Sequence, residues 1–404
     1  EPLAKISAQA ESQMSQARTL EDVGPLPLAM HLMGWMIEHH DSFEMGWNVA
    51  VRTLISEKTQ SDKLERARRR FPEEPREETL FDIDEDQRLA MWQRVFDGMA
   101  RELKIRLWQP VLPLLRACGA TRLVLVPDAD LHTLPLALGL MDEADAPGVM
   151  MAPTLQLYDR CLQALREREP RENTLMLIVN PTQDLSAAAL EAQLLRDLFA
   201  AHRQATFTLA ETQATQQNVI RTSRVGNYWH FAGHARYTWW DSSLSALSLA
   251  NGENLPLFWV PMWMDFHATR LVTLSACETA MTPARDPAQE YTGLFTAFLT
   301  AGAPTVLASL WDVDSISTAL LMHRFYQYHL GDPREGIAPR SPADALRHAQ
   351  RWLRELQYKE LSQMQQIRKL PAGNPLWQQI LAAEKYDRPF ANPYFWAGFV
   401  LIGA

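Results

Sequence analysis

Two histidines and a cysteine are the side chains of this chain whose types and spacing could do chemistry. His230 and His234 stand four residues apart in the stretch YWHFAGHARY, and Cys277 ends the stretch LVTLSAC. An imidazole beside a thiol can take the thiol's proton and make the sulfur a nucleophile. Two histidines four residues apart can instead bind zinc when they share one face of a helix. The elements that carry these residues distinguish the two chemistries.

The zinc alternative requires both histidines to reach one ion. The residues around them are apolar and β-rich, and residues four apart on a strand are separated by roughly 13 Å, at ~3.3 Å per residue. Zinc–nitrogen bonds are only about 2 Å long. The sequence also contains no HExxH and no CxxC stretch. We therefore expect no metal and no cofactor here, and we interpret His230 as a partly buried residue packed along a strand.

Short apolar segments alternate with helical patterns over most of the chain. Near-continuous apolar runs are typical of strands buried on both faces of a parallel sheet. The alternation predicts an α/β fold, an open and mostly parallel sheet with helices on both faces. The predicted strands are 122–128, 175–181, 227–234, 270–277 and 305–311, with a closing strand 399–403 at a sheet edge, and the predicted helices are 152–168, 185–202, 288–302 and 315–330.

His234 and Cys277 each stand at the end of a predicted strand. In open parallel sheets, ligands bind outside the carboxyl ends of the strands. If these two strands are neighbours, the imidazole and the thiol meet at the same edge of the sheet. Cys277 also precedes the polar loop 279–291, whereas we interpret Cys118 and Cys161 as small buried hydrophobic residues.

Composition limits the class of partner. The net charge is −9, and the sequence pI is about 5.7, which argues against a basic nucleic-acid-binding face. Three widely spaced cysteines do not form a disulfide framework and favour a reducing compartment. The sequence shows no apolar run of membrane-spanning length and no secretory signal. We expect a cytoplasmic protein that binds neither nucleic acid nor membrane directly.

The chain divides in sequence into three parts. Residues 1–56 show helical apolar stripes, and residues 57–88 are charge-dense and proline-broken, as in a solvated linker. Residues 89–404 form the predicted α/β domain. Its first helical stretch should bend at Pro110 and Pro113, and residues 354–392 are helical and polar, as in a surface helical hairpin or a partner-binding surface.

Several motifs, taken in order, resemble those of the CHAT family (caspase HetF associated with TPRs), caspase-like cysteine peptidases related to separase. The stretches are HFAGHARY, LVTLSACETA, GAPTVLASLWDVDS and NPYFWAGFVLIG, preceded by LVLVPDADLHTLPLALGL and VNPTQDLSAAALEAQLL. The likeness runs from about residue 95 to the C-terminus. It implies a caspase-like fold in which His234 and Cys277 form the catalytic dyad.

The same resemblance implies the other parts of a peptidase site. The backbone N–H groups of Cys277 and Ala235 would hold the oxyanion, although the family usually has glycine where this chain has Ala235. A segment that resembles the substrate groove of these peptidases comprises Leu310, Trp311, Asp312, Val313 and Asp314. Asp312 and Asp314 would attract a basic substrate residue or would cap the helix that begins near Ser315. Asp241 is a further groove candidate, with a plain loop role as its alternative.

Two functions from different classes follow. The first is a cysteine endopeptidase that cleaves a protein partner and is activated by a sensor or partner module, in bacterial defence, for example CRISPR-associated defence, or in cell-death signalling. The second is a catalytically weak CHAT-like scaffold or adaptor that binds extended peptide. The resemblance implies a TPR-like or defence-associated regulator. Residues 1–56 would be its remnant or docking part, and partner binding or oligomerisation would order the loop 279–291.

Overall fold

The computed structural model describes residues 85–127, 129–168, 172–236, 245–276, 294–311, 313–370 and 373–404. The predicted N-terminal segment 1–56 lies outside the described residues, as does all of the linker 57–88 before Glu85. The chain divides into two compact units, Glu1–Leu107 and Trp108–Ala404. The predicted strands and the candidate site belong to the second unit.

The first described helix, α6 (Glu85–Leu103), begins inside the predicted linker. A π-helical segment, Lys104–Trp108, separates it from α7 (Gln109–Ala117). Pro110 lies in the first turn of α7, where its missing N–H is not needed, and Pro113 lies inside that helix. A proline ring clashes with the carbonyl four residues earlier. The irregular part of the helix is therefore the π-helical segment, which lies before Pro110 and Pro113 and not at them.

An eight-stranded sheet forms the centre of the second unit, with the strand order β1-β2-β11-β10-β9-β5-β3-β4. All neighbouring pairs are parallel except β10 and β11. The predicted mostly parallel sheet is confirmed. Its strands are β1 Leu123–Leu125, β2 Val149–Met151, β3 Thr174–Val179, β4 Ala205–Ala210, β5 Tyr228–Ala232, β9 Leu271–Ser275, β10 Thr305–Ser309 and β11 Phe399–Gly403.

The closing strand has the predicted bounds, but its predicted place at a sheet edge is wrong. β11 lies between β10, with which it pairs antiparallel, and β2, with which it pairs parallel. All five of its residues are buried. An uninterrupted apolar run of this kind needs a neighbour on each side and a covered surface on each face.

The strands that lead to the candidate site are buried throughout. Every residue of β5, β9 and β10 is buried, as the near-continuous apolar runs predicted. β4, which the sequence analysis did not identify, forms one edge of the sheet and alternates exposed with half-buried residues in its first half. A half-solvated edge strand carries polar residues and gives a weaker hydrophobic signal.

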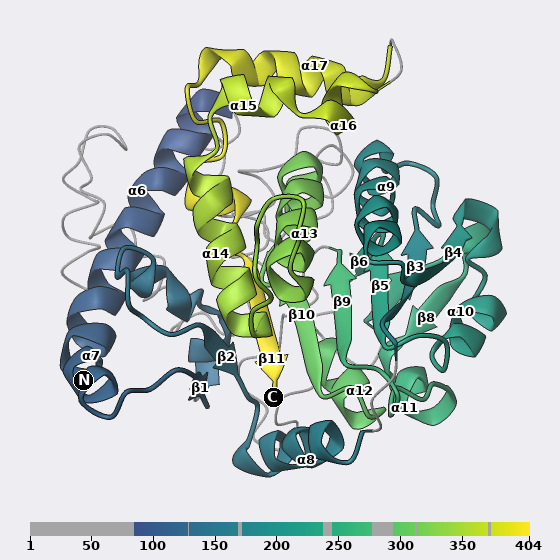
Figure 1. The fold of residues 1–404 in the computed structure, drawn as a ribbon, viewed down its shortest axis with the longest axis horizontal. Helices are drawn as coiled ribbons and strands as arrows, with labels where there is room; N and C mark the ends of the chain where they lie inside the picture. Colours follow the sequence, from purple (N-terminus) through teal and green to yellow (C-terminus); the bar gives the residue numbers. More distant parts are fainter. Residues whose placement is uncertain are drawn as a thin grey trace, which may run out of the picture. The chain divides into compact units, whose positions relative to one another are not determined.

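Helices cover both faces of the sheet. Figure 1 shows α9, α13 and α14 side by side over one face, and α13 contacts both of the other two. α12 packs against β10, and α8 packs against β11. The predicted helices are observed as α8 Leu155–Arg166, α9 Ser186–Ala201, α12 Leu294–Thr300 and α13 Ser315–Leu330, whereas α10 Gln216–Thr222, α11 Val260–Trp263 and α14 Pro342–Glu355 were not predicted.

Smaller elements complete the unit. After the end of α14, the described residues up to 392 include three short helices, α15 Tyr358–Gln363, α16 Gln365–Arg368 and α17 Pro375–Ala382. An antiparallel sheet is built from β6 Ala235–Arg236, β7 Ala246–Ser248 and β8 Asn254–Pro256. Short 3-10 helices occur at Ala129–Thr133, Leu136–Leu140, Glu211–Gln213, Ala250–Gly252, Leu257–Trp259, Ala383–Lys385 and Pro393–Phe395. Among the described helices, none combines the length and the apolar character needed to cross a membrane.

Aromatic side chains fill the core around β5. The ring of Trp229 contacts Phe266 and Phe298, and Tyr228 meets Phe199 and Tyr326 edge to face. Such rings bury large apolar areas and pack in specific geometries. The strand that ends just before His234 is therefore held rigidly.

Candidate active site

Four neighbouring strands end at one edge of the sheet. β3, β5, β9 and β10 run parallel, and the register pairs Ala232 with both Val179 and Ser275. The carboxyl ends of β3, β5 and β9 are therefore level. In parallel sheets this edge is where ligands bind. The loops that follow the four strands carry most of the side chains singled out from the sequence.

His234 lies at the end of β5, as predicted, one residue beyond Gly233. Its side chain is 39% exposed, and its Nε2 lies 3.1 Å from Oδ1 of Asp184. Two backbone hydrogen bonds fix this strand end: Gly233 N–H donates to the Ser275 carbonyl at 3.3 Å, and the His234 carbonyl accepts from Ser248 N–H at 2.9 Å. The imidazole is thus held on a firm backbone but remains accessible to solvent.

Asp184, in the loop between β3 and α9, was not singled out by the sequence analysis. Thr182 donates its hydroxyl to Oδ1 of Asp184 at 2.5 Å. The loop is tied to the end of β5, because Asn180 N–H donates to the Ala232 carbonyl at 2.8 Å and the Asn180 side chain accepts from Leu185 N–H at 3.0 Å. The carboxyl-end rule marks Asp184 as a candidate, because it follows a predicted strand by only a few residues, but does not predict its pairing with His234.

The electrostatics of this pair favour a charged carboxylate. Partial burial raises the pKa of Asp184, but the hydrogen bond from Thr182 and the proximity of His234 outweigh this effect and hold the pKa below its ordinary value. A carboxylate accepts hydrogen bonds only, so Nε2 of His234 is the donor. That tautomer leaves Nδ1 of His234 as the nitrogen that can take a proton.

Three of the predicted site residues, Cys277, Asp241 and Asp312, lie outside the described residues. β9 is described to its end at Ser275, followed by the buried Ala276, whose carbonyl accepts from the Ser309 hydroxyl at 2.7 Å. Cys277 is the next residue in sequence. The roles of these three residues stay predictions.

Ala235 occupies an ordinary strand conformation. It is the first residue of β6 and pairs with Leu247. The residues with positive φ in the described chain do not include Ala235, so the extra methyl group relative to glycine imposes no backbone strain. The oxyanion-donor role of Ala235 stays a prediction.

The predicted groove segment follows β10 at the same edge. Leu310 and Trp311 are buried, and Trp311 Nε1 donates to the Tyr394 carbonyl at 3.0 Å. Asp314 caps α13, because its carboxylate accepts from Ser317 N–H at 2.8 Å. Burial raises the pKa of Asp314, and the hydrogen bonds from Ser317 lower it in part. The capping alternative is confirmed for Asp314, while Val313 is half-buried and the substrate-binding role of the segment stays a prediction.

The two histidines of β5 and its end have separate partners. His230 is fully buried, and its Nε2 lies 2.8 Å from Oε1 of Glu191 in α9. The two imidazoles are therefore engaged by different carboxylates. Among the described residues, no three histidine, cysteine or acidic side chains gather as they would around a metal ion.

The other two cysteines differ from each other. Cys161 is buried, as expected, and burial raises the pKa of its thiol to about 11 against the weaker opposing influence of Arg168. Cys118 is exposed, so its interpretation as a buried hydrophobic residue is wrong. It follows the last residue of α7, where the chain turns towards β1 at the surface.

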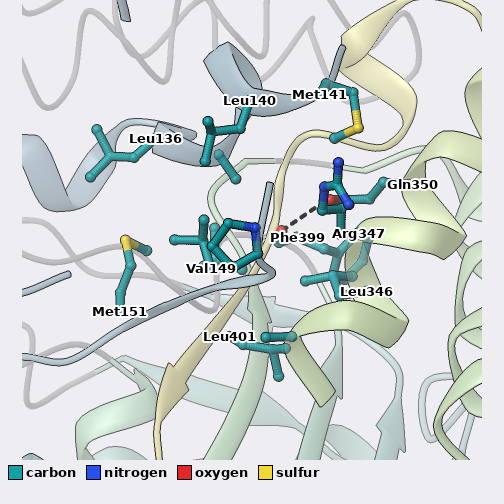
Figure 2. Close-up of a pocket in the computed structure, with 14 residues that line it drawn as sticks. Leu136, Leu140, Met141, Val149, Met151, Leu346, Arg347, Gln350, Phe399 and Leu401 are labelled. Carbon is teal, nitrogen blue, oxygen red and sulfur yellow. Dashed lines mark hydrogen bonds between the residues drawn. The ribbon is translucent and has the colours of Figure 1, made fainter. Parts of the chain in front are cut away.

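A cavity in the described chain lies away from His234. Figure 2 shows apolar side chains around it from the Leu136–Leu140 helix, β2, β11 and α14, with Gln350 bonded to the Phe399 carbonyl at 3.0 Å. Arg347, the charged member of the lining, is directed to the carbonyls of Glu143 and Ala144. The cavity lies beside β2 and β11, in the part of the sheet beyond β10, and it holds no pair of groups suited to catalysis.

Comparison with solved structures finds cysteine proteinases at low similarity. The Arg-specific cysteine proteinase gingipain R shares 12% sequence identity, with 76% of this chain and 67% of that chain covered and a TM-score of 0.45. A Saccharomyces cerevisiae separase–securin complex shares 13% identity, with all of this chain and 27% of that chain covered and a TM-score of 0.46. This chain thus spans about a quarter of that separase chain. No curated protein sequence matches it.

Comparison with protein families gives a match over most of the chain. Residues 97–404 match the CHAT domain. The matched region includes every strand of the large sheet and the Asp184–His234 pair. The resemblance drawn from the sequence motifs is confirmed: the chain belongs to the CHAT domain family.

Proposed function

We propose that this chain is a cysteine endopeptidase in which His234 activates the thiol of Cys277. The observation that carries the proposal is the His234–Asp184 pair at the end of β5, beside β9, whose last residue precedes Cys277 by two positions. Membership of the CHAT family supports it. An oriented imidazole next to the strand that leads to a cysteine is the arrangement that a thiol nucleophile requires.

The proposed chemistry follows from the ring nitrogen of His234 that is left to accept a proton. Nδ1 of His234 takes the proton of the Cys277 thiol, and the thiolate attacks the carbonyl carbon of the scissile peptide bond. Backbone N–H groups of Cys277 and Ala235 stabilise the resulting oxyanion. The imidazolium then gives its proton to the departing amine, which leaves a thioester on Cys277. Water, deprotonated by His234, hydrolyses the thioester and restores the enzyme.

Asp184 supports each proton transfer. Its carboxylate accepts from Nε2 of His234, so it selects the tautomer that presents a proton-accepting Nδ1. It also stabilises the imidazolium that forms after the thiol loses its proton. Because the carboxylate is 60% exposed, its contribution is screened by water and smaller than that of a buried carboxylate.

The substrate is a protein segment in extended conformation. The loop after β10 lies at the same edge as His234, and an extended peptide there would gain backbone hydrogen bonds in the manner of an added strand. Since Asp314 is committed to capping α13, Asp312 is the remaining acidic residue of that segment to attract a basic side chain before the scissile bond. Asp241 is a second groove candidate.

Activation depends on a second protein or on oligomerisation. The segment 279–291 follows the nucleophile and contains Pro283, Arg285 and Pro287, and we place the switch there. The regulator is a sensor of TPR-like or defence-associated type, and the setting is cytoplasmic bacterial defence, CRISPR-associated or otherwise, or cell-death signalling. Robust cleavage by the isolated monomer would contradict this part of the proposal.

The experiment compares the full chain with Cys277→Ala and His234→Ala on a peptide library, with and without candidate activators. Alkylation by iodoacetamide, resolved by mass spectrometry, gives a second readout in which the exposed Cys118 of the same molecule serves as the reference thiol. We expect cleavage to require both residues and Cys277 to react faster than Cys118 near neutral pH. If Cys277 reacts no faster than Cys118 and His234→Ala changes nothing, the adaptor function replaces the peptidase.

A further inference from the structure

A buried carboxylate lies beneath the site, on the helix that covers β5. Glu191 of α9 and His230 of β5 are 3% and 0% exposed, and Ser275 at the end of β9 is 6% exposed. Oε1 of Glu191 lies 2.8 Å from Nε2 of His230, and the Ser275 hydroxyl donates to Oε2 at 3.0 Å. We name these three residues the Glu191 cluster. Each oxygen of the Glu191 carboxylate bonds to a residue of a different strand.

The Glu191 cluster joins the three segments that carry the proposed site. α9, which carries Glu191, begins directly after the loop of Asp184. β5, which carries His230, leads to His234. β9 ends at Ser275, two positions before Cys277 in sequence. Figure 1 shows α9 lying over β5 and its neighbour β3.

Burial of a carboxylate is unfavourable in free energy, so apolar side chains at these positions would stabilise the core more. Taking a carboxylate out of water is strongly unfavourable unless its oxygens are well bonded, and apolar replacements of buried ionic groups are often neutral or stabilising. The two hydrogen bonds of Glu191 add a directional constraint on the elements that they join. Apolar side chains allow neighbouring elements to slide and rotate, whereas a carboxylate with one partner on each strand fixes both strands relative to the helix.

The contacts of His230 agree with a fixed, non-catalytic role. Its Nε2 lies 2.8 Å from Oε1 of Glu191, and its Nδ1 has no hydrogen-bond partner among the described residues. The side chain is fully buried, so it is closed off from solvent.

Resting on the proposed function, we propose that Glu191 is a positioning residue of the peptidase, holding β5, β9 and α9 so that His234 and Asp184 meet at the end of the sheet. The alignment needed for proton transfer is narrow, and a displacement of about 1 Å can lower a rate roughly 100-fold. Loss of a Glu191 contact should therefore lower turnover more than stability alone would explain.

The test compares two hydroxyl deletions on the same strand. Ser275→Ala removes the β9 contact of Glu191. Thr273→Val, the matched control, removes a buried hydroxyl two residues earlier that contacts Tyr326 of α13 at 2.9 Å and not α9. Glu191→Gln keeps the size but cannot accept from both strands, and Ser275→Thr keeps the hydroxyl. Activity is measured on a peptide that the wild type cleaves, per folded molecule as judged by circular dichroism.

We expect Ser275→Ala and Glu191→Gln to lower kcat about 10- to 100-fold with KM changed by less than about threefold. Thr273→Val should keep kcat within about twofold although it lowers the melting temperature, and Ser275→Thr should restore most of the kcat lost in Ser275→Ala. Cys277 alkylation should slow in parallel with kcat. Wild-type kcat in Ser275→Ala and Glu191→Gln, or an equal loss in Thr273→Val, overturns the positioning role.

The alkylation readout separates this inference from the proposed function. An active wild type with variants of unchanged kcat refutes the role of Glu191 alone. A wild type that cleaves no peptide and whose Cys277 reacts no faster than Cys118 refutes the peptidase, and the positioning role falls with it. If Glu191→Gln does not fold, Ser275→Ala and Thr273→Val decide the matter between them.

Discussion

Two histidine–carboxylate pairs, four residues apart along the chain, have opposite surroundings. The His230–Glu191 pair is closed off from solvent, with side chains 0% and 4% exposed and 2.8 Å between the bonded atoms. The His234–Asp184 pair is open, with side chains 39% and 60% exposed and a separation of 3.1 Å. The same two functional groups, an imidazole and a carboxylate, are therefore paired once in a low-dielectric core and once at a solvent-exposed edge of the sheet.

The difference shows what burial does to one kind of pair. In the core, a change of charge would leave an unpaired group that water cannot solvate, so the His230–Glu191 pair is restricted to holding elements together. At the edge, the His234–Asp184 pair is partly exposed to water, so its imidazole is accessible to a reacting group. The buried histidine lies within β5, and the exposed one lies two residues beyond the end of that strand.

The largest expected effect is the loss of activity in His234→Ala. Removal of a general acid–base group lowers turnover about 10²- to 10⁴-fold. Because the side chain is partly exposed, the free energy of unfolding should change by less than about 0.5 kcal/mol. Steady-state cleavage assays and urea titration measure the two quantities. A variant that loses stability and keeps activity would reverse the assignment of the two histidines.

His230→Ala should show the opposite pattern. It leaves the buried Glu191 carboxylate without one of its donors and opens a cavity in the core. We expect the free energy of unfolding to fall by about 3 kcal/mol. Urea denaturation followed by fluorescence gives the value, with His202→Ala, a half-buried histidine bonded to the Gly331 carbonyl, as the comparison. Equal losses in both variants would show that the Glu191 contact has no special weight.

Gly233, between the two pairs, tolerates no side chain. A Cβ atom there would lie 2.7 Å from the ring of Phe231 and 3.1 Å from Cδ of Pro181. Since Phe231 is fully buried, its ring cannot move without disturbing the core. We expect Gly233→Ala to lower the free energy of unfolding by about 1–3 kcal/mol and to reduce activity through displacement of His234. An unchanged melting temperature of this variant would contradict the prediction, because it would show that the end of β5 can shift to accommodate a methyl group.

Asp184→Asn should lower kcat roughly tenfold, less than the loss of a buried triad carboxylate. An amide keeps the size but can present N–H to Nε2 of His234 and favour the wrong tautomer. Asp184→Glu, which keeps the charge, is the control. Loss of activity in the Glu variant but not in the Asn variant would show that shape and not charge orients His234.

The smallest effect is the dependence of stability on acid pH. Asp184 has a pKa below its ordinary value in the folded chain, so the folded state binds fewer protons than the unfolded state in this range. Its stabilising contribution is therefore present above about pH 4 and is lost as the pH falls through the folded-state pKa. The urea midpoints of wild type and Asp184→Asn should differ slightly at pH 6 and converge towards pH 3. A gap that widens with acid would show the opposite sign.

The sequence was sufficient for elements whose signal is local. The predicted strands all occur, and the helix predicted at 315–330 is α13 with the same bounds, begun by an aspartate cap. β4 and α14 were missed, because a half-exposed edge strand and a charged amphipathic helix carry weaker signals. The edge position expected for 399–403 was wrong, since a strand's neighbours are chosen by packing and not by its own residues.

The candidate site shows the same division. The apolar run that ends at His234, with glycine just before it, placed this histidine at a strand end from the sequence alone, because hydrophobic periodicity is read within a few residues. No local sequence pattern predicts that Asp184, fifty residues earlier, bonds to His234, or that Glu191 contacts two strands. Those contacts exist because crossovers bring β3, β5 and β9 together and α9 packs over them, which only the tertiary structure decides.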